Sequence, residues 1–171
     1  MKNLTLILVA AFAMLALRST GMAQYAKEKH FIGPHIGLSG VGSTFSFGGD
    51  YEYGVTENIG VGALLDYWSY DFGSFGFTSG YSYRYIAIGA IGSYHFLLTD
   101  KKWDPFLGLG LGYYIVSVTT PAGGITTGLD DSRLFLGAQG GIRYFFSPKI
   151  AAQARLGFGA YIIAVGVDFK F

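Results

Sequence analysis

Apolar and polar residues alternate along most of the chain after residue 30. The last eleven residues show the pattern best, because every odd position from Tyr161 to Phe171 is apolar or aromatic while the even positions include Asp168 and Lys170. A period of two residues is typical of a β-strand with one apolar and one polar face. Eleven residues also match the length of a tilted strand that crosses a bilayer. The pattern therefore predicts a membrane-spanning strand that ends on Phe171.

Seven further segments alternate in the same way, which gives eight predicted strands. They cover approximately residues 31–39, 45–55, 59–70, 81–96, 105–118, 132–146, 149–158 and 161–171. Pro34 weakens the first prediction because proline cannot donate to a strand ladder. In the fourth segment the facing is ambiguous, and we favour Ile86 and Ile88 outward. An even number of such strands predicts an all-β fold, an eight-stranded antiparallel up-and-down transmembrane β-barrel.

The connections between the predicted strands differ in length. Those after the second, fourth and sixth strands are compact, and we interpret residues 97–104 as one of these turns. Residues 72–80 and 119–131 form longer, glycine-containing loops on the opposite side. Short periplasmic turns and longer external loops are usual in barrels of this kind. The final connection, at Gly159 and Ala160, is short and breaks the trend.

The first 23 residues have the features of a cleaved signal peptide. Lys2 gives a positive start, residues 4–17 are almost entirely apolar, and Gly21, Met22 and Ala23 form a small-x-small cleavage site. A membrane anchor helix is the alternative, but the apolar run is shorter than the roughly 20 residues of a typical span. We expect secretion across the inner membrane and one barrel domain, residues 24–171.

The composition fits a protein surrounded by lipid. Hydrophobic residues make up 51% of the chain and charged residues only 13%, whereas soluble domains carry about 25% charged residues. The net charge of +1 argues against a nucleic-acid partner, which would require a basic surface. The chain has no cysteine, so disulfide and thiol chemistry are excluded.

The polar faces of the predicted strands place charged and amide side chains inside the barrel. They are Asp50, Glu52, Asp66, Gln139, Arg143, Gln153, Arg155 and Asp168, with Lys170 as a further candidate. Side chains can just fill the interior of an eight-stranded barrel. We therefore expect acids and bases to pair in a network that closes the lumen. An ion path along the same residues is the alternative.

No catalytic or metal-binding pattern emerges from the sequence. His30, His35 and His95 form no His-x-x-x-His pair, and we expect them in the lumen or in an aromatic girdle. The glycines at 108, 110 and 112 lie inside a strand, without the helix that a dinucleotide loop needs. His35 and Ser39 share a face but lie roughly 13 Å apart, at about 3.3 Å per residue. We predict that the protein is not an enzyme and that it has no cofactor or metal.

Aromatic residues are concentrated between positions 68 and 85. The proposed contact residues in this segment are Phe72, Phe75, Phe77 and Tyr81. Exposed aromatic side chains mark binding surfaces, so the segment predicts an adhesive or ligand-contacting region. The alternative is the aromatic girdle of the outer leaflet.

Four features together identify a family. They are the leader, the eight alternating segments, the Tyr-Gly-Val-Thr-Glu-Asn-Ile-Gly-Val-Gly hairpin at residues 53–62 and the terminal Phe171. With these features the chain resembles the small outer-membrane β-barrel proteins of the OmpA/OmpX type. The resemblance implies a place in the outer membrane of a Gram-negative bacterium and recognition of Phe169 and Phe171 by the barrel-assembly machinery. The chain lacks the peptidoglycan-binding domain of OmpA, so no cell-wall tether is implied.

We therefore expect a structural or surface-interaction role, in which the external loops contact a surface ligand. Outer-membrane lipid covers the outer face, and because that face needs no partner subunit a monomer is expected. A narrow, porin-like pore or small-ligand carrier is the second hypothesis, and a lipid-modifying outer-membrane enzyme is the third.

Overall fold

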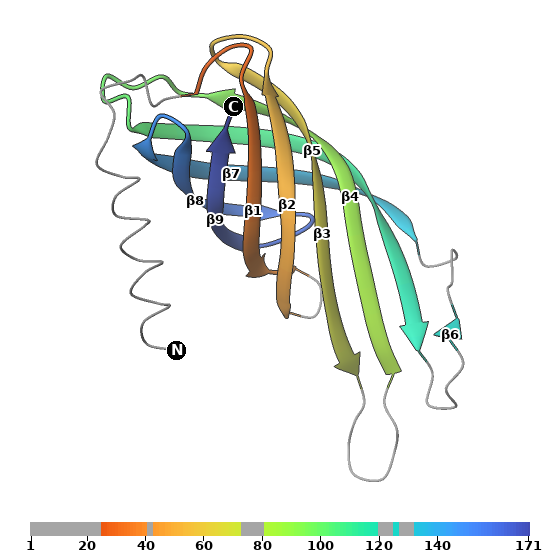
Figure 1. The fold of residues 1–171 in the computed structure, drawn as a ribbon. Helices are drawn as coiled ribbons and strands as arrows, with labels where there is room; N and C mark the ends of the chain where they lie inside the picture. Colours follow the sequence, from red (N-terminus) through yellow and green to blue (C-terminus); the bar gives the residue numbers. More distant parts are fainter. Residues whose placement is uncertain (1–24, 41–42, 73–80, 120–124, 127–131) are drawn as a thin grey trace, which may run out of the picture.

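Eight long strands and one two-residue strand form a single antiparallel sheet (Figure 1). The structure is a computed structural model that describes residues 25–40, 43–72, 81–119, 125–126 and 132–171. The strands are β1 (His30–Leu38), β2 (Phe45–Gly54), β3 (Ile59–Phe72), β4 (Tyr81–His95), β5 (Trp103–Thr119), β6 (Ile125–Thr126), β7 (Arg133–Ser147), β8 (Ile150–Phe158) and β9 (Ile163–Lys170). The predicted signal peptide, residues 1–23, lies outside the described residues. Among the described residues, no helix is long and apolar enough to span a membrane.

The sheet closes into a barrel. Its strands follow the order β4-β3-β2-β1-β9-β8-β7-β5, and β4 also pairs with β5. The short β6 pairs only with the end of β5. Closure lets neighbouring strands supply the backbone hydrogen bonds that lipid cannot provide. The predicted eight-stranded antiparallel transmembrane barrel is thus confirmed.

Three strand boundaries differ from the sequence-based predictions in a way that matters for function. Asp104, which we assigned to a turn, lies in β5 opposite Arg143 of β7. Tyr161, which we placed at the outward start of the last strand, precedes β9 and is only 4% exposed. The chain turns inward there because Gly159 adopts a positive φ of 105°, a conformation that favours glycine. Residues 72 and 119 belong to strands, and β6 lies inside the predicted 119–131 loop.

The strands expose one face and bury the other. On β5, Leu107, Leu109 and Leu111 are exposed on the outer wall, while Phe106 and Tyr114 point inward and are buried. Ile86 and Ile88 of β4 face outward, which is the facing that we favoured. The apolar outer wall is the surface that lipid covers in a membrane barrel.

Pro34 is accommodated inside β1 by a gap in one ladder. On one side, β1 pairs continuously with β2, and Pro34 lies opposite Gly49. On the other side, the register against β9 passes from Ile32 to His35 and omits Gly33 and Pro34. Proline has no N–H to donate. The pairing with β9 is therefore interrupted at Pro34, while the continuous pairing with β2 holds β1 in the sheet.

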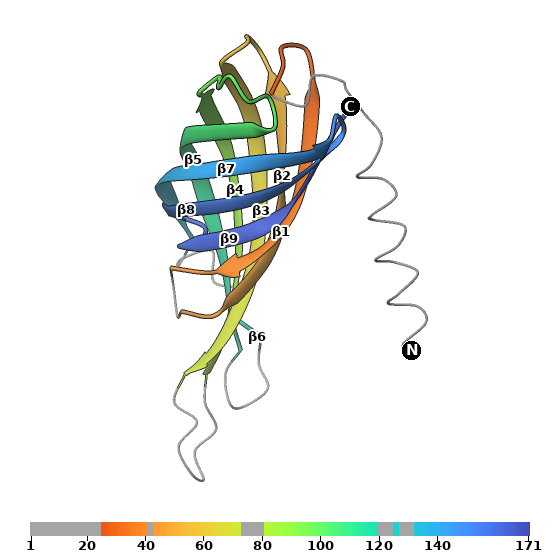
Figure 2. The same ribbon diagram turned by 90° about the vertical axis from the view of Figure 1, so that its left-hand side faces the viewer.

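The barrel wall has unequal height. The strands β3, β4 and β5 have 14, 15 and 17 residues, whereas β1, β8 and β9 have 9, 9 and 8. Figures 1 and 2 show β3, β4 and β5 running well past the ends of β1 and β9. We call this side the loop end. The opposite side, which carries Tyr25, Phe171 and the short turns at 55–58 and 148–149, is the turn end.

Candidate functional site

The lumen contains two groups of side chains of different chemistry. Toward the turn end lies an ionic layer, made of Asp50, Glu52, Asp66, Asp104, Asp168, Arg143, Arg155, His35 and His95. Toward the loop end lies an aromatic layer, made of Leu64, Trp68, Tyr85, Tyr114, Val116, Phe135, Ala160 and Tyr161. Each layer is built from the inward positions of the alternating strands.

Arg143 of β7 is the centre of the ionic layer. Its guanidinium donates from Nη2 to Glu52 Oε2 at 2.5 Å, from Nε to Asp168 Oδ2 at 2.6 Å and from Nη1 to Asp104 Oδ2 at 3.4 Å. The group also lies 5.0 Å from the ring centroid of Phe31 and 4.9 Å from that of Phe106. Three carboxylates and two aromatic rings therefore compensate a cation whose side chain is only 1% exposed.

Arg155 of β8 forms a second ionic centre beside the first. Its Nη2 donates to Asp50 Oδ2 at 2.8 Å and lies 4.0 Å from Asp168 Oδ1. Its Nη1 donates to the Tyr161 hydroxyl at 3.4 Å. Because Asp168 also accepts from Arg143, this carboxylate joins the two arginines into one network.

His95 lies between two carboxylates at the turn end. Its Nδ1 is 2.8 Å from Asp104 Oδ1 and its Nε2 is 2.8 Å from Glu52 Oε1. An ionised carboxylate only accepts hydrogen bonds, so with both carboxylates ionised the two ring nitrogens donate and the ring is an imidazolium. The ring of Tyr25 stacks on His95 from the turn end. Burial, followed by the nearby Glu52 carboxylate, raises the pKa of the Tyr25 hydroxyl.

His35 of β1 repeats this arrangement deeper in the lumen. Its Nε2 is 3.0 Å from Asp66 Oδ1. Its Nδ1 is 3.4 Å from Asp50 Oδ1 and 3.2 Å from the Gly33 carbonyl oxygen. All of these partners are acceptors, so this ring is also a double donor. The two imidazoliums bring the positive charges of the layer to four, against five carboxylates.

Gly33 shows how closely the polar side chains fill this part of the lumen. A Cβ at this position would lie 2.2 Å from Asp168 Oδ1, 2.7 Å from Gln153 Nε2 and 2.9 Å from Asp50 Oδ1. These contacts are shorter than any Cβ makes, so only glycine leaves room for the three side chains. Such packing is the expected state of an eight-stranded barrel interior.

All eight predicted lumen residues lie on the inner face of the barrel. Seven of them are buried, and Gln139 is half-buried and accepts a hydrogen bond from Tyr161. Sequence reasoning missed the part that Asp104, His35 and His95 take in the network. The sequence did contain a signal for Asp104. Even-numbered residues such as Phe106 and Gly108 face inward on this strand, and Asp104 continues that series.

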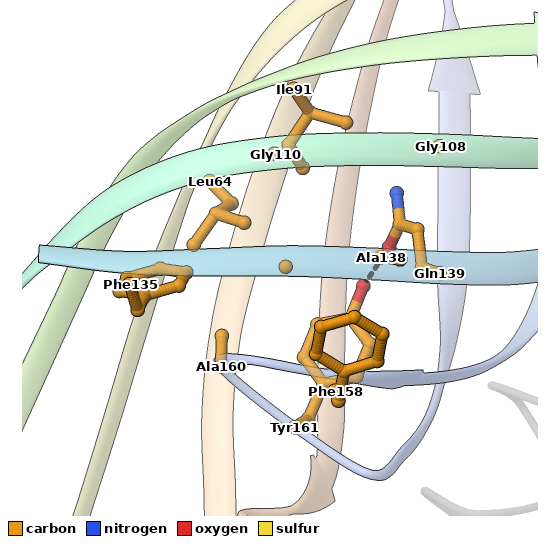
Figure 3. Close-up of a pocket in the computed structure, with 11 residues that line it drawn as sticks. Leu64, Ile91, Gly108, Gly110, Phe135, Ala138, Gln139, Phe158, Ala160 and Tyr161 are labelled. Atoms are coloured by element: carbon orange, nitrogen blue, oxygen red, sulfur yellow. Dashed lines mark hydrogen bonds between the residues drawn. The ribbon is translucent and has the colours of Figure 1, made fainter.

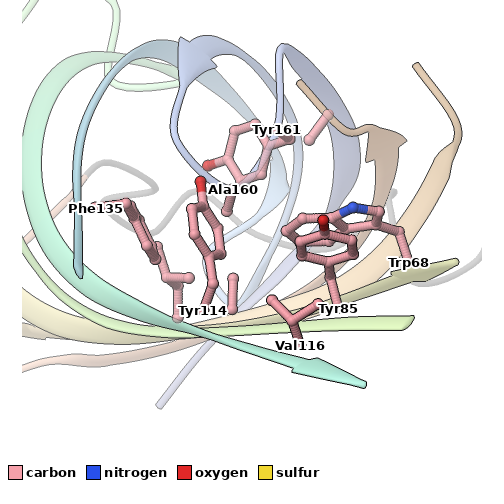
Figure 4. Packing of buried hydrophobic residues seen from close by; sticks show 10 residues of the cluster. Trp68, Tyr85, Tyr114, Val116, Phe135, Ala160 and Tyr161 are labelled. Carbon is pink, nitrogen blue, oxygen red and sulfur yellow. The ribbon is translucent and has the colours of Figure 1, made fainter. Parts of the chain in front are cut away.

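The aromatic layer is held by ring contacts and by the inward turn before β9 (Figure 4). Trp68 and Tyr85 stack with centroids 5.3 Å apart, and Tyr114 and Phe135 stack at 4.3 Å. Tyr161 enters the layer from the turn at residues 159–162. The Tyr114 hydroxyl donates to the Gly159 carbonyl at 2.9 Å and holds that turn in place.

A small cavity lies beside the aromatic layer (Figure 3). Its volume is about 20 Å³, and Leu64, Ile91, Phe135 and Tyr161 line it. The hydrogen bond from Tyr161 to Gln139 forms its polar edge (Figure 3). A cavity of this size holds about one water molecule.

The remaining predicted residues lie at the two ends of the barrel. At the turn end, Phe169 and Phe171 are 39% and 64% exposed. At the loop end, Tyr81 is the first residue of β4 and is 47% exposed. Phe72 ends β3, and Phe75 and Phe77 lie outside the described residues.

Comparison with known families agrees with this architecture. Residues 4–170 match the family described as "Outer membrane protein beta-barrel domain". The chain belongs to this family. Membership places the barrel in the bacterial outer membrane, and the resemblance to small eight-stranded outer-membrane barrels is confirmed. Barrels of this kind place their longer loops on the extracellular side.

Solved structures of other bacterial barrels share the fold. The N-terminal β-barrel domain of OprF from Pseudomonas aeruginosa is 19% identical with a TM-score of 0.58, over 86% of this chain and 100% of that one. OprG from the same organism is 9% identical with a TM-score of 0.62, over 88% and 99%. Neisserial surface protein A is 20% identical with a TM-score of 0.55, over 84% and 95%. No curated protein matched the chain. At these identities the likeness concerns the fold alone.

Proposed function

We propose that the protein is a non-enzymatic outer-membrane barrel with a closed lumen, which serves as a structural element and presents its loop end for contacts at the cell surface. The observation that carries this proposal is the filled lumen. The guanidinium groups of Arg143 and Arg155 make all of the ion pairs described above with carboxylates inside the barrel. The acids and bases of the ionic layer therefore pair with one another across the lumen.

The small cavity supports a closed lumen over the alternative of a narrow pore or small-ligand carrier. Its volume of about 20 Å³ is far below the roughly 300–1,000 Å³ of typical ligand pockets. A larger hollow of about 820 Å³ is lined mainly by exposed residues of the outer wall, among them Val61, Leu107 and Leu109. Purified mature protein in planar bilayers should therefore show no stable conductance. Current steps of reproducible size would overturn the proposal. A lipid-modifying enzyme is tested separately, by an activity screen on lipid A and phospholipid, which we expect to be negative.

The surface role rests on the exposed loop end. There the longest strands extend beyond the length that crosses a bilayer, and Tyr81 is accessible. Neisserial surface protein A, which shares the fold, is named for a surface location. We assign secretion to the signal peptide and assembly in the membrane to Phe169 and Phe171, with lipid as the surrounding partner and a monomer as the working form. Replacing Phe171 with alanine should lower the amount of assembled barrel in the outer membrane, measured as the heat-modifiable form on gels.

A further inference from the structure

The outward face reverses from apolar to polar at the loop ends of β3, β4 and β5, while the inward face stays apolar and aromatic. We call residues 69–72, 81–84 and 116–119 the external ribbon. Its outward positions are all polar, namely Ser69, Asp71, Ser82, Arg84, Ser117 and Thr119. Its described inward positions are all apolar or aromatic, namely Tyr70, Tyr81, Tyr83, Val116 and Val118. Two residues further toward the turn end on the same strands, the outward side chains Tyr67, Ile86 and Ile115 are still apolar.

This reversal places the external ribbon outside the bilayer. A lipid-facing wall is apolar, and charged side chains such as Asp71 and Arg84 are costly in it. Both are exposed on the outer face of the ribbon, so water surrounds that face. The strands are also longer than the roughly 9–11 residues that cross a bilayer, and the excess lies at the loop end. An aromatic sheet face therefore stands in the aqueous space above the membrane.

The inner face of the external ribbon is a continuous stack of rings. Tyr70 lies 5.2 Å from Tyr83 and 5.9 Å from Tyr85, with ring planes within 16° of parallel. Tyr85 in turn stacks on Trp68 at the floor of the ribbon. Tyr70 and Tyr83 are half-buried and Tyr81 is 47% exposed. The inner face of the external ribbon thus presents flat apolar rings that carry phenolic hydroxyls at their edges.

We propose that this inner face of the external ribbon binds a neutral saccharide. The proposal rests on the surface role proposed above and names the ligand class. The apolar face of a sugar ring can stack on an aromatic ring, and the hydroxyls of the sugar find partners in the tyrosine hydroxyls, because tyrosine combines an apolar body with a polar tip. Among the described residues, the inner positions of the ribbon carry no charge, which favours a neutral chain over a sulfated or acidic one.

Two other occupants fit the surface less well. A stable protein interface takes about 20–30 residues from each partner, whereas the inner face of the ribbon has five positions among the described side chains. A lipid acyl chain belongs to the bilayer, and the polar outer face holds the ribbon above it. A small ring-shaped ligand with many hydroxyls matches both the size of the surface and its surroundings.

The experiment uses tryptophan fluorescence, because the chain has two tryptophans at opposite ends of the barrel. Replacing Trp103 with phenylalanine leaves Trp68, at the floor of the external ribbon, as the reporter. The refolded mature barrel is applied to an array of neutral, sialylated and sulfated glycans, and the best neutral glycan is then titrated in solution. We expect saturable binding that changes the Trp68 emission. Tyr83→Ser should weaken binding by at least tenfold. Tyr83→Phe keeps the aromatic ring and should lose less affinity.

The matched control is Tyr94→Ser, the same substitution at an exposed tyrosine near the turn end, and it should leave binding unchanged. All variants are checked for heat-modifiable folding first. Binding to no glycan, binding only to sulfated or sialylated glycans, or equal binding by Tyr83→Ser would each overturn the proposal. Conductance of the same preparation is measured in parallel. A non-conducting barrel that binds no glycan overturns the ligand class alone, whereas stable conductance overturns the proposed closed lumen.

Discussion

The ionic and aromatic layers close the same lumen by different forces. The difference determines how each layer responds to the substitution of one side chain. In the ionic layer, every charge depends on partners from other strands, so removal of Arg143 leaves three carboxylates without it. In the aromatic layer, each ring contributes by contact area, so a smaller side chain causes a graded loss. A lipid-surrounded lumen can therefore contain many charges, provided that all of them are paired.

The largest effect is expected from breaking the centre of the ionic layer. Arg143→Met should lower the free energy of unfolding by about 3–5 kcal/mol, because removing one partner of a buried ion pair leaves uncompensated charge. The measurement is urea unfolding in lipid vesicles. Arg84→Met is the matched control, since Arg84 is exposed on the external ribbon, and it should change the value by less than about 0.5 kcal/mol. Similar losses for the two variants would contradict the central position of Arg143.

A second substitution compares the lipid-facing wall around the lumen with the external ribbon. Leu109 is 73% exposed on the outer face of β5, and Leu109→Arg should cost about 2–4 kcal/mol if it lies at the bilayer midplane. Ser117 lies on the same face of the same strand, within the ribbon. Ser117→Arg should cost less than about 1 kcal/mol, as is found near the interface. Equal costs in vesicle unfolding would show that the membrane boundary does not lie between the two residues.

The smallest effect concerns the one turn that the aromatic layer holds by a hydrogen bond. Tyr114→Phe removes the bond to the Gly159 carbonyl and should lower the free energy of unfolding by about 1 kcal/mol. Tyr94→Phe, on the exposed outer face of β4, should have no measurable effect. If Tyr114→Phe were also silent in the same unfolding assay, ring contacts alone would hold the turn.

Much of the barrel could be predicted because its alternation is local. Whether a residue of a strand faces lipid or lumen depends on its number alone, so Leu109 and Arg143 could be placed from the sequence. Tyr161 could not, because it lies in the turn at Gly159, whose φ is positive, and the regular alternation begins only with β9. Asp104 was missed for a related reason, since a charged residue beside the Lys101 and Lys102 turn looks like part of that turn.

No local sequence pattern determines which acids and bases pair with each other inside the lumen. Which acid meets Arg143 depends on the tilt and stagger of the closed sheet, and these set Glu52, Asp104 and Asp168 around one guanidinium. Sequence analysis predicted that acids and bases would pair but could not say which. The bridging position of the two histidines emerges only when β1, β2, β3, β4 and β5 are placed side by side.

The partners of Arg143 also have a kinetic consequence. They lie 91, 39 and 25 residues away along the chain, on β2, β5 and β9. Contacts of such separation form late, because the intervening chain must be ordered first, and β9 is the last strand to be made. The network is therefore complete only after the first and last strands meet. Interactions that are absent from the folding transition state act mainly by slowing unfolding. We therefore expect the buried ion pairs to lower the unfolding rate of the assembled barrel more than they raise its folding rate.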